Sequence, residues 1–175
     1  MTYATTFGSP IGRLTLLSDG EALTGLYMED HRHGPAWNPE WAREAGLPAF
    51  SCASAQLAAY FAGELQEFDL PLQADGSEFQ TAVWNELRRI PYGETISYGE
   101  LARRVGSPGS SRAVGLANGR NPISIVVPCH RVIGASGKLT GYGGGLERKA
   151  ALLDFERDVR MFGPHPLEVR SEPAR

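Results

Sequence analysis

Cysteine is scarce in this chain of 175 residues, which contains only Cys52 and Cys129. Two cysteines so far apart do not form the disulfide framework of a small secreted domain, so each is interpreted singly. Apolar runs are short as well. None approaches the roughly 20 residues that span a bilayer, and the amino terminus lacks the charged-then-apolar pattern of a secretory signal. We therefore expect a cytoplasmic protein with no membrane partner.

The chain also lacks the usual patterns of metal and nucleotide sites. His31 and His33 flank an arginine in a loop with no cysteine nearby, and Cys52 lies among small residues that favour a helix. We interpret both histidines as surface residues and Cys52 as a small hydrophobe. The glycines at 141–145 do not form a GxGxxG pattern between a strand and a helix, and no GxxxxGK(S/T) loop occurs. The sequence predicts no bound metal and no dinucleotide.

An overall excess of positive charge, which would favour a nucleic-acid partner, is absent, because the net charge is −3. The average conceals an asymmetry. Residues 1–78 carry 3 basic and 11 acidic side chains, whereas residues 79–160 carry 12 basic and 7 acidic ones. Either the second half alone meets a polyanion, or the solvated surface is simply uneven in charge.

Apolar and polar residues alternate over 3–28, with two turn sequences between them. This pattern predicts three antiparallel strands, and residues 52–63 follow as a helix that ends at a glycine. A connector at 70–78 then separates two units. The expected organisation is an α/β domain at 1–76, a mostly helical domain at 77–162, and a loose tail at 163–175.

Helix signals dominate the second unit. Ser77, with Gln80 three positions later, forms a capping-box pattern at a helix start. Two short helices at 96–106 and 111–119 are joined by a Gly/Pro turn and are typical of a helix-turn-helix, although many helix corners share this pattern. The remaining expected elements are an apolar strand or extended segment at 123–127 and a final helix at 146–159.

Cys129 stands where the apolar segment ends, directly before His130 and Arg131. A nearby base or cation lowers the pKa of a thiol, and the thiolate is a strong nucleophile. A lone cysteine is, however, commonly a buried structural residue. Neighbouring residues of an extended chain point to opposite sides, so His130 needs a water, or a turn at Pro128, to reach the sulfur.

Glu156 lies between apolar positions of the last predicted helix, where a carboxylate needs a partner. One interpretation is a relay in which Glu156 orients His130 and His130 activates Cys129. The other is an ordinary carboxylate at a helix edge. Asn121, before a proline, is typical of a turn and can brace the segment that carries the cysteine.

Small residues recur at helical spacing in the predicted helix 111–119, at Ala113 and Ala117 and at Gly115 and Gly119. They serve either core packing or a close approach to a nucleic-acid groove. Arg112, at the start of this helix, is the cation best placed to enter DNA.

Taken together, these residues resemble a known family. The stretches NPISIVVPCHRVIG, ISYGELA, SRAVGLANGRNP and GYGGGLERK are similar to those of the methylated-DNA–protein-cysteine methyltransferases, the O6-alkylguanine-DNA alkyltransferases. The resemblance runs from Phe79 to Glu156, and the N-terminal part shares the SPIGRL hairpin. It is closest to the bacterial stand-alone form. It implies a ribonuclease-H-like α/β N-terminal domain and a mostly helical C-terminal domain with a winged-helix-like helix-turn-helix.

The resemblance implies DNA repair by an irreversible, stoichiometric transfer of the alkyl group from O6-alkylguanine, and from O4-alkylthymine, to Cys129 itself. His130 would act as base through a bridging water, Glu156 would hold His130, and Asn121 would brace the active-site turns. No cofactor is needed, because a thiolate, a leaving oxygen and alignment suffice. Some relatives carry a structural zinc in the N-terminal domain, but its ligand cluster is missing here, so we expect none. The implied partner is double-stranded DNA containing O6-alkylguanine, bound by a monomer.

Base flipping from the minor groove is implied as well. Tyr98 would rotate the nucleotide out of the duplex and bond the base, and Arg112 would fill the place left in the stack. The implied substrate-binding residues are Tyr98, Val132, Tyr142 and Gly143, the last a position where some relatives have serine. The implied DNA-binding residues are Tyr98, Arg112, Ala113, Gly115, Ala117 and Gly119.

Two other functions are alternatives. A non-catalytic alkyl-lesion-binding protein would bind the damaged base with Cys129 inert. An unrelated cysteine hydrolase would turn over an acyl substrate. Family members that lack the cysteine bind lesions without transfer, so the presence of Cys129 favours the transferase.

Overall fold

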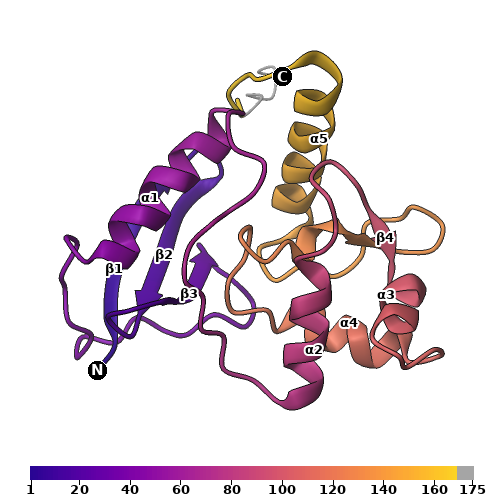
Figure 1. The fold of residues 1–175 in the computed structure, drawn as a ribbon, viewed down its shortest axis with the longest axis horizontal. Helices are drawn as coiled ribbons and strands as arrows, with labels where there is room; N and C mark the ends of the chain where they lie inside the picture. The colour runs from indigo at the N-terminus through magenta and orange to yellow at the C-terminus, as the bar shows by residue number, and fades with distance from the viewer. Residues whose placement is uncertain (169–175) are drawn as a thin grey trace, which may run out of the picture.

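The N-terminal unit is built on a three-stranded antiparallel sheet (Figure 1). The computed structural model describes residues 1–168. Leu14 and Leu16 of the central strand are fully buried, because alternate side chains of a strand face the same side. The meander predicted for residues 3–28 is confirmed. Its strands, paired in chain order, are β1 (Tyr3–Ser9), β2 (Gly12–Ser18) and β3 (Leu23–Met28).

Helix α1 (Pro48–Phe61) lies along this sheet and covers it with apolar side chains (Figure 1). The helix begins earlier than the predicted residue 52. Pro48 stands in its first turn, where the missing backbone N–H costs no hydrogen bond. Phe50, Leu57 and Tyr60 on its inner face are at most 1% exposed. Burial of these large side chains holds the helix to the sheet.

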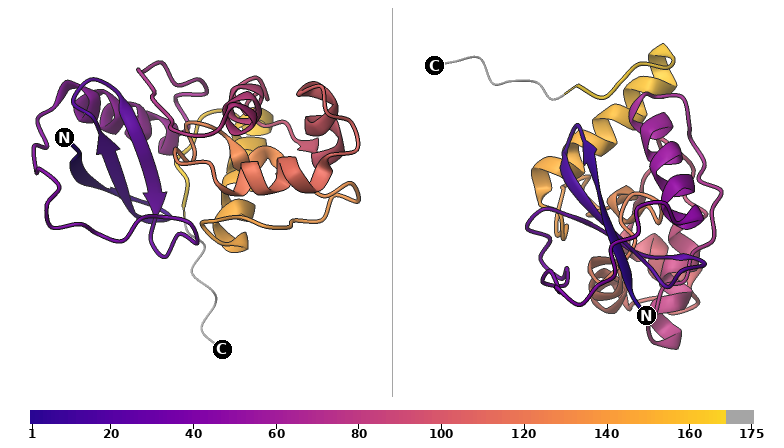
Figure 2. Two further views of the ribbon diagram at one scale, coloured as in Figure 1. Left: turned by 90° about the horizontal axis from the view of Figure 1, so that it is seen from below. Right: turned by 90° about the vertical axis from the view of Figure 1, so that its left-hand side faces the viewer.

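The C-terminal unit lies beside the first and consists mainly of helices (Figure 2). Ser77 caps its first helix by accepting from the backbone N–H of Gln80, and the side-chain oxygen of Gln80 accepts from the backbone N–H of Ser77. The predicted capping box is therefore confirmed. A short pair of parallel strands joins distant parts of this unit. The elements are α2 (Glu78–Leu87), β4 (Ile96–Ser97), α3 (Tyr98–Arg104), α4 (Ser111–Gly119), η1 (Cys129–Arg131), β5 (Val132–Ile133) and α5 (Leu146–Phe162).

Helices α3 and α4 confirm the two short helices predicted at 96–106 and 111–119. Both contact α2 and each other. The indole N–H of Trp84 on α2 donates to the carbonyl of Ala117 on α4 at 2.8 Å. These contacts fix α4 on the core with its opposite face outward.

The segment 123–127 is a tight turn and not the strand or extended segment that its apolar sequence predicts. Asn121 causes the difference, because its side-chain amide accepts from the N–H of Ile123 at 3.0 Å and donates to the carbonyl of Val127 at 2.8 Å. Ile125 consequently has a φ of 72°, which is strained for a β-branched residue. The turn also joins the two units, since Ser124 donates its N–H to the carbonyl of Leu26 in β3.

The segment expected to be a loose tail starts with residues that pack on the N-terminal unit. Leu167 is 7% exposed, and its N–H donates to the carbonyl of Phe61 at the end of α1. Residues 169–175 of that expected tail lie outside the described residues. Across residues 1–168, no helix combines the length and apolar character needed to cross a membrane.

Candidate active site

Cys129 is the first residue of η1, directly after the tight turn. Its side chain is buried, with the residue 4% exposed. Burial raises the pKa of the Cys129 thiol, and the side chain of Asn121 and the positive charge of Lys149 partly offset this effect. The thiol is therefore protonated at neutral pH and needs a base before it can act as a nucleophile.

His130 and Glu156 form a fully buried pair. Nε2 of His130 lies 2.7 Å from Oε2 of Glu156, and neither side chain is exposed to solvent. The contact between Glu156 and His130 that the relay interpretation requires is present, and Glu156 is not an exposed carboxylate at a helix edge. Burial lowers the pKa of His130, although Glu156 acts in the opposite direction. The imidazole is thus neutral at pH 7, as a general base must be.

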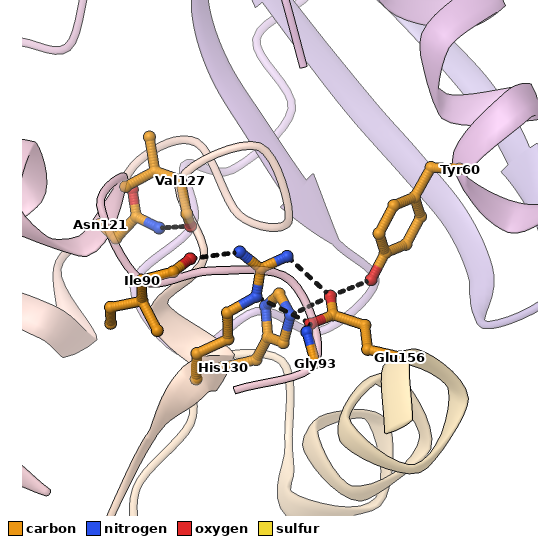
Figure 3. Close-up of polar contacts among 8 residues, drawn as sticks. Tyr60, Ile90, Gly93, Asn121, Val127, His130 and Glu156 are labelled. Atoms are coloured by element: carbon orange, nitrogen blue, oxygen red, sulfur yellow. Dashed lines mark hydrogen bonds and ion pairs between the residues drawn. The ribbon is translucent and has the colours of Figure 1, made fainter. Parts of the chain in front are cut away.

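Glu156 accepts hydrogen bonds from several sides (Figure 3). Arg131 donates through Nε to Oε1 at 2.7 Å and through Nη2 to Oε2 at 3.0 Å. Tyr60 on α1 donates its hydroxyl to Oε2 at 2.6 Å, and the N–H of Gly93 lies 3.3 Å from Oε1. Burial alone would raise the pKa of Glu156, but His130 and Arg131 together hold it well below its ordinary value. Glu156 is ionised.

Sequence reasoning missed Tyr60 and Lys149 and gave Arg131 no specific role. The ammonium of Lys149 donates to the backbone carbonyls of Val132 at 2.6 Å and Thr140 at 3.1 Å. Burial lowers the pKa of Lys149 to about 8. Arg131 could have been found from its place beside His130, but nothing in the sequence links Tyr60 to residues far along the chain.

Two tyrosines lie at the loop between β5 and α5. Tyr142 belongs to this loop, and Tyr98 contacts it from α3. Tyr98, at the start of α3, donates its hydroxyl to the carbonyl of Thr140 at 3.0 Å, and the ammonium of Lys149 lies 5.9 Å from the centre of its ring. The hydroxyl of Tyr142 is buried and has no hydrogen-bond partner within residues 1–168. Besides burial, Cys129 contributes to the raised pKa of both Tyr98 and Tyr142, so both tyrosines lie near the thiol. Their contacts with substrate stay a prediction.

His31 is not the free surface residue that its loop context predicts. Its ring occupies the space that a side chain at Gly143 would need, and its Nε2 lies 3.4 Å from the hydroxyl of Ser124. The N–H of Arg32 also donates to the carbonyl of Gly143 at 2.8 Å. The N-terminal loop therefore packs on the glycine loop 141–145. Burial, with the charges of nearby basic groups, lowers the pKa of His31 to about 4.

The small residues of α4 divide between two environments. Arg112 and Ala113 are exposed, and Gly115 and Gly119 are half-buried. Ala117 instead is 3% exposed and belongs to the core, which is the packing alternative for this residue. The exposed face of α4 therefore carries Ala113 beside Arg112, which forms no ion pair within residues 1–168.

Metal-ligating side chains do not gather anywhere in the described part of the chain. Among residues 1–168, no group of three or more His, Cys, Asp or Glu side chains could hold an ion. His130 and Glu156, the polar side chains that follow Cys129 in the proposed relay, are instead hydrogen-bonded to each other.

Family models match both units. The model described as 6-O-methylguanine DNA methyltransferase, ribonuclease-like domain, matches residues 2–74. The model described as 6-O-methylguanine DNA methyltransferase, DNA binding domain, matches residues 78–158. The α/β fold and the helical second unit predicted from the sequence are therefore confirmed.

Curated relatives and solved structures agree with these matches. The methylated-DNA–protein-cysteine methyltransferase of Mycobacterium tuberculosis is 58% identical over 157 residues, which is 90% of this chain and 93% of that protein. The Haemophilus influenzae protein of the same name is 47% identical over 89% of this chain and 86% of its own.

A crystal structure of Mycobacterium tuberculosis OGT in complex with DNA is similar with a TM-score of 0.83 and 57% identity, over 89% of this chain and 93% of that one. An O6-methylguanine-DNA methyltransferase from Pyrococcus kodakaraensis has a TM-score of 0.63 at 25% identity, over 89% and 99% of the two chains. The family matches extend over both units, and the second of them includes residues 129, 130 and 156. This chain belongs to the methylated-DNA–protein-cysteine methyltransferase family.

Proposed function

We infer that this chain repairs O6-methylguanine in DNA by transferring the methyl group to its own Cys129. The observation that carries this inference is a buried thiol followed by a neutral His130 that is bonded to an ionised Glu156. Such a relay activates a cysteine that burial would otherwise keep protonated. The family supplies the reaction class, and these residues supply the chemistry.

The proton of Cys129 passes to Nδ1 of His130. An ionised carboxylate only accepts hydrogen bonds, so Nε2 of His130 carries the proton that faces Glu156. Nδ1 is then the basic nitrogen, and it is buried with no partner in the described residues. A water between Nδ1 and the sulfur completes this path, because neighbouring residues of the short helix η1 point about a third of a turn apart and do not face each other.

The transfer is a single displacement. The sulfur of Cys129 bonds to the methyl carbon while the bond from that carbon to O6 breaks, and the electron pair stays on guanine. Burial raises the pKa of Tyr98, so its hydroxyl keeps its proton at neutral pH. This hydroxyl donates a hydrogen bond to the ring nitrogen of guanine and offsets the negative charge left on the base. A thioether does not hydrolyse, so each molecule reacts once. No cofactor enters the reaction.

Access to the base requires that it leave the stack. Arg112 and the exposed small residues of α4 enter the minor groove, and Arg112 fills the place of the extruded guanine. Backbone groups of Val132 and Gly143, with Tyr142, contact the base. The homologue crystallised with DNA supports DNA as the partner.

The proposal also includes the oligomeric state, the division into two units and a second substrate. The chain acts as a monomer, with the catalytic unit at 77–162 and the α/β unit at 1–76. The two family matches support this division, since one ends at residue 74 and the other begins at residue 78. O4-alkylthymine is a second substrate, because its alkyl–oxygen bond presents the same displacement to the thiol.

Duplex DNA with O6-[³H-methyl]guanine tests the transfer. We expect one label per protein molecule, on Cys129, and none on the Cys129→Ala variant. The Cys52→Ser variant is the matched control and should keep full labelling, because the sulfur of Cys52 contacts Gln56 and the carbonyl of Asp69, which are both outside the relay. Binding without label would identify a lesion-binding protein, and many turnovers per molecule would identify a hydrolase. Either result would reject the proposal.

A further inference from the structure

We propose that Tyr60, on α1 of the N-terminal unit, is a positioning residue of the relay that acts on His130 through Glu156. The hydroxyl of Tyr60 donates to Oε2 of Glu156 at 2.6 Å, and this is the oxygen that faces Nε2 of His130 at 2.7 Å. Figure 3 shows Tyr60 reaching from α1 to Glu156 on α5. Oε2 of Glu156 thus connects the N-terminal unit to His130, the general base.

The environment of Tyr60 keeps this bond in a single geometry. The side chain is fully buried, and its ring lies 5.2 to 6.2 Å from the rings of its aromatic neighbours, which are Phe61, Phe68, Tyr92 and Phe155. Burial and the nearby Glu156 charge raise the pKa of Tyr60 well above its ordinary value. Tyr60 therefore stays protonated and is always the donor to Glu156.

This bond affects the basicity of His130. A hydrogen-bond donor on Oε2 withdraws negative charge from the oxygen that stabilises the imidazolium. The pKa of His130 is therefore lower with this donor present than it would be if Oε2 lacked it. Arg131 also donates to Oε2, but it donates to Oε1 as well, so its charge acts on both carboxylate oxygens. Tyr60 bonds Oε2 alone. Loss of its hydroxyl therefore increases the negative charge on the same oxygen that faces His130.

The test is the pH dependence of single-turnover transfer from free O6-benzylguanine, which avoids effects on DNA binding. In wild-type protein the rate falls at low pH as His130 becomes protonated. In Tyr60→Phe we expect this fall to begin about one pH unit higher, with unchanged affinity for duplex DNA. A merely structural role would lower the melting temperature and scale the rate equally at every pH.

Tyr92→Phe is the matched control. The hydroxyl of Tyr92 is also buried, lies in the same aromatic cluster as Tyr60, and has no hydrogen-bond partner within residues 1–168. Its loss should leave the pH profile in place. A Tyr60→Phe profile that coincides with that of Tyr92→Phe would overturn the role of Tyr60.

Two further comparisons keep the result decisive. In the Glu156→Gln background, Tyr60→Phe should shift the profile no further, because the carboxylate through which Tyr60 acts is gone; an equal shift in both backgrounds overturns the proposal. If Tyr60→Phe does not fold, 3-fluorotyrosine at position 60 is a stronger donor and should move the fall to lower pH, and an unmoved profile counts against Tyr60.

The role of Tyr60 rests on the proposed transfer reaction, but the two fail differently. A wild-type protein that takes no alkyl group would overturn both. Normal transfer by the wild type, with identical profiles for Tyr60→Phe and Tyr92→Phe, would overturn the role of Tyr60 alone.

Discussion

Arg131 holds Glu156 with a two-pronged ion pair, Nε to Oε1 at 2.7 Å and Nη2 to Oε2 at 3.0 Å, inside the protein core. The third guanidinium nitrogen donates to the carbonyl of Ile90 at 2.7 Å. His130 and this pair together keep Glu156 ionised where burial would otherwise raise its pKa and favour its protonation. His130 therefore faces a carboxylate whose charge and orientation are set before substrate arrives.

Arg131→Met should lower the free energy of unfolding by about 3–5 kcal/mol, because it leaves a buried carboxylate with too few donors. Arg103→Met is the control, since Arg103 pairs with Glu100 at the surface with 63% of its side chain exposed. That change should cost less than about 1 kcal/mol. Denaturant unfolding measures both. Similar losses in the two variants would contradict the buried role of Arg131.

Acid should weaken the fold through Glu156. Its pKa in the folded protein lies below the ordinary 4.5, so its contribution to stability is complete above pH 4.5. It is lost progressively as pH falls and the unfolded carboxylate takes up a proton first. Unfolding experiments on wild type and Glu156→Gln between pH 3 and 7 check this. The stability difference between the two proteins should shrink towards low pH; a constant difference would contradict it.

Glu156→Gln should slow alkyl transfer by about 100-fold, because an amide cannot stabilise the imidazolium that forms on His130. Affinity for duplex DNA should stay nearly constant, since Glu156 has no exposed surface. Stopped-flow transfer and equilibrium binding separate the two quantities. Glu147→Gln, on the exposed start of the same helix, serves as control. An unchanged transfer rate in Glu156→Gln would reject the orienting role.

Arg112→Ala should slow repair in duplex DNA about tenfold, because the cavity left by the extruded base is then unfilled and unstacking costs a few kcal/mol. The reaction with free O6-benzylguanine should keep its rate. Arg157→Ala, an exposed arginine of α5, is the control for loss of one positive charge. Equal losses on both substrates would argue against a stacking role for Arg112.

Gly143→Ala should destabilise the protein by about 1–3 kcal/mol, because the added methyl group meets the ring of His31. His31→Ala removes that ring and should relieve most of the cost. A double-mutant cycle in thermal or denaturant unfolding therefore shows strong coupling between the two positions. Additive effects would mean that the N-terminal loop does not hold the glycine loop.

The sequence alone predicted most of the local structure and the family. The alternation over 3–28 predicted the sheet, and the Ser77 and Gln80 pattern predicted the start of α2, because both signals are short-range. Cys129, His130 and Glu156 were identified by motif, and the motif also named Asn121. What periodicity could not reveal was the turn at 123–127, where one amide side chain outweighs a run of strand-forming residues.

The tertiary structure decided which distant groups meet at the carboxylate. Tyr60 is 96 positions from Glu156, and His31 packs on a loop that follows it by more than a hundred residues. No local pattern reports such contacts, because they depend on how the sheet and α1 are packed against the helical unit. The sequence by itself predicted the nucleophile and its base. Packing determined the charge on Glu156, the protonation of His130 and the contact of Tyr60 with Glu156, because these depend on burial and on groups brought from elsewhere in the chain.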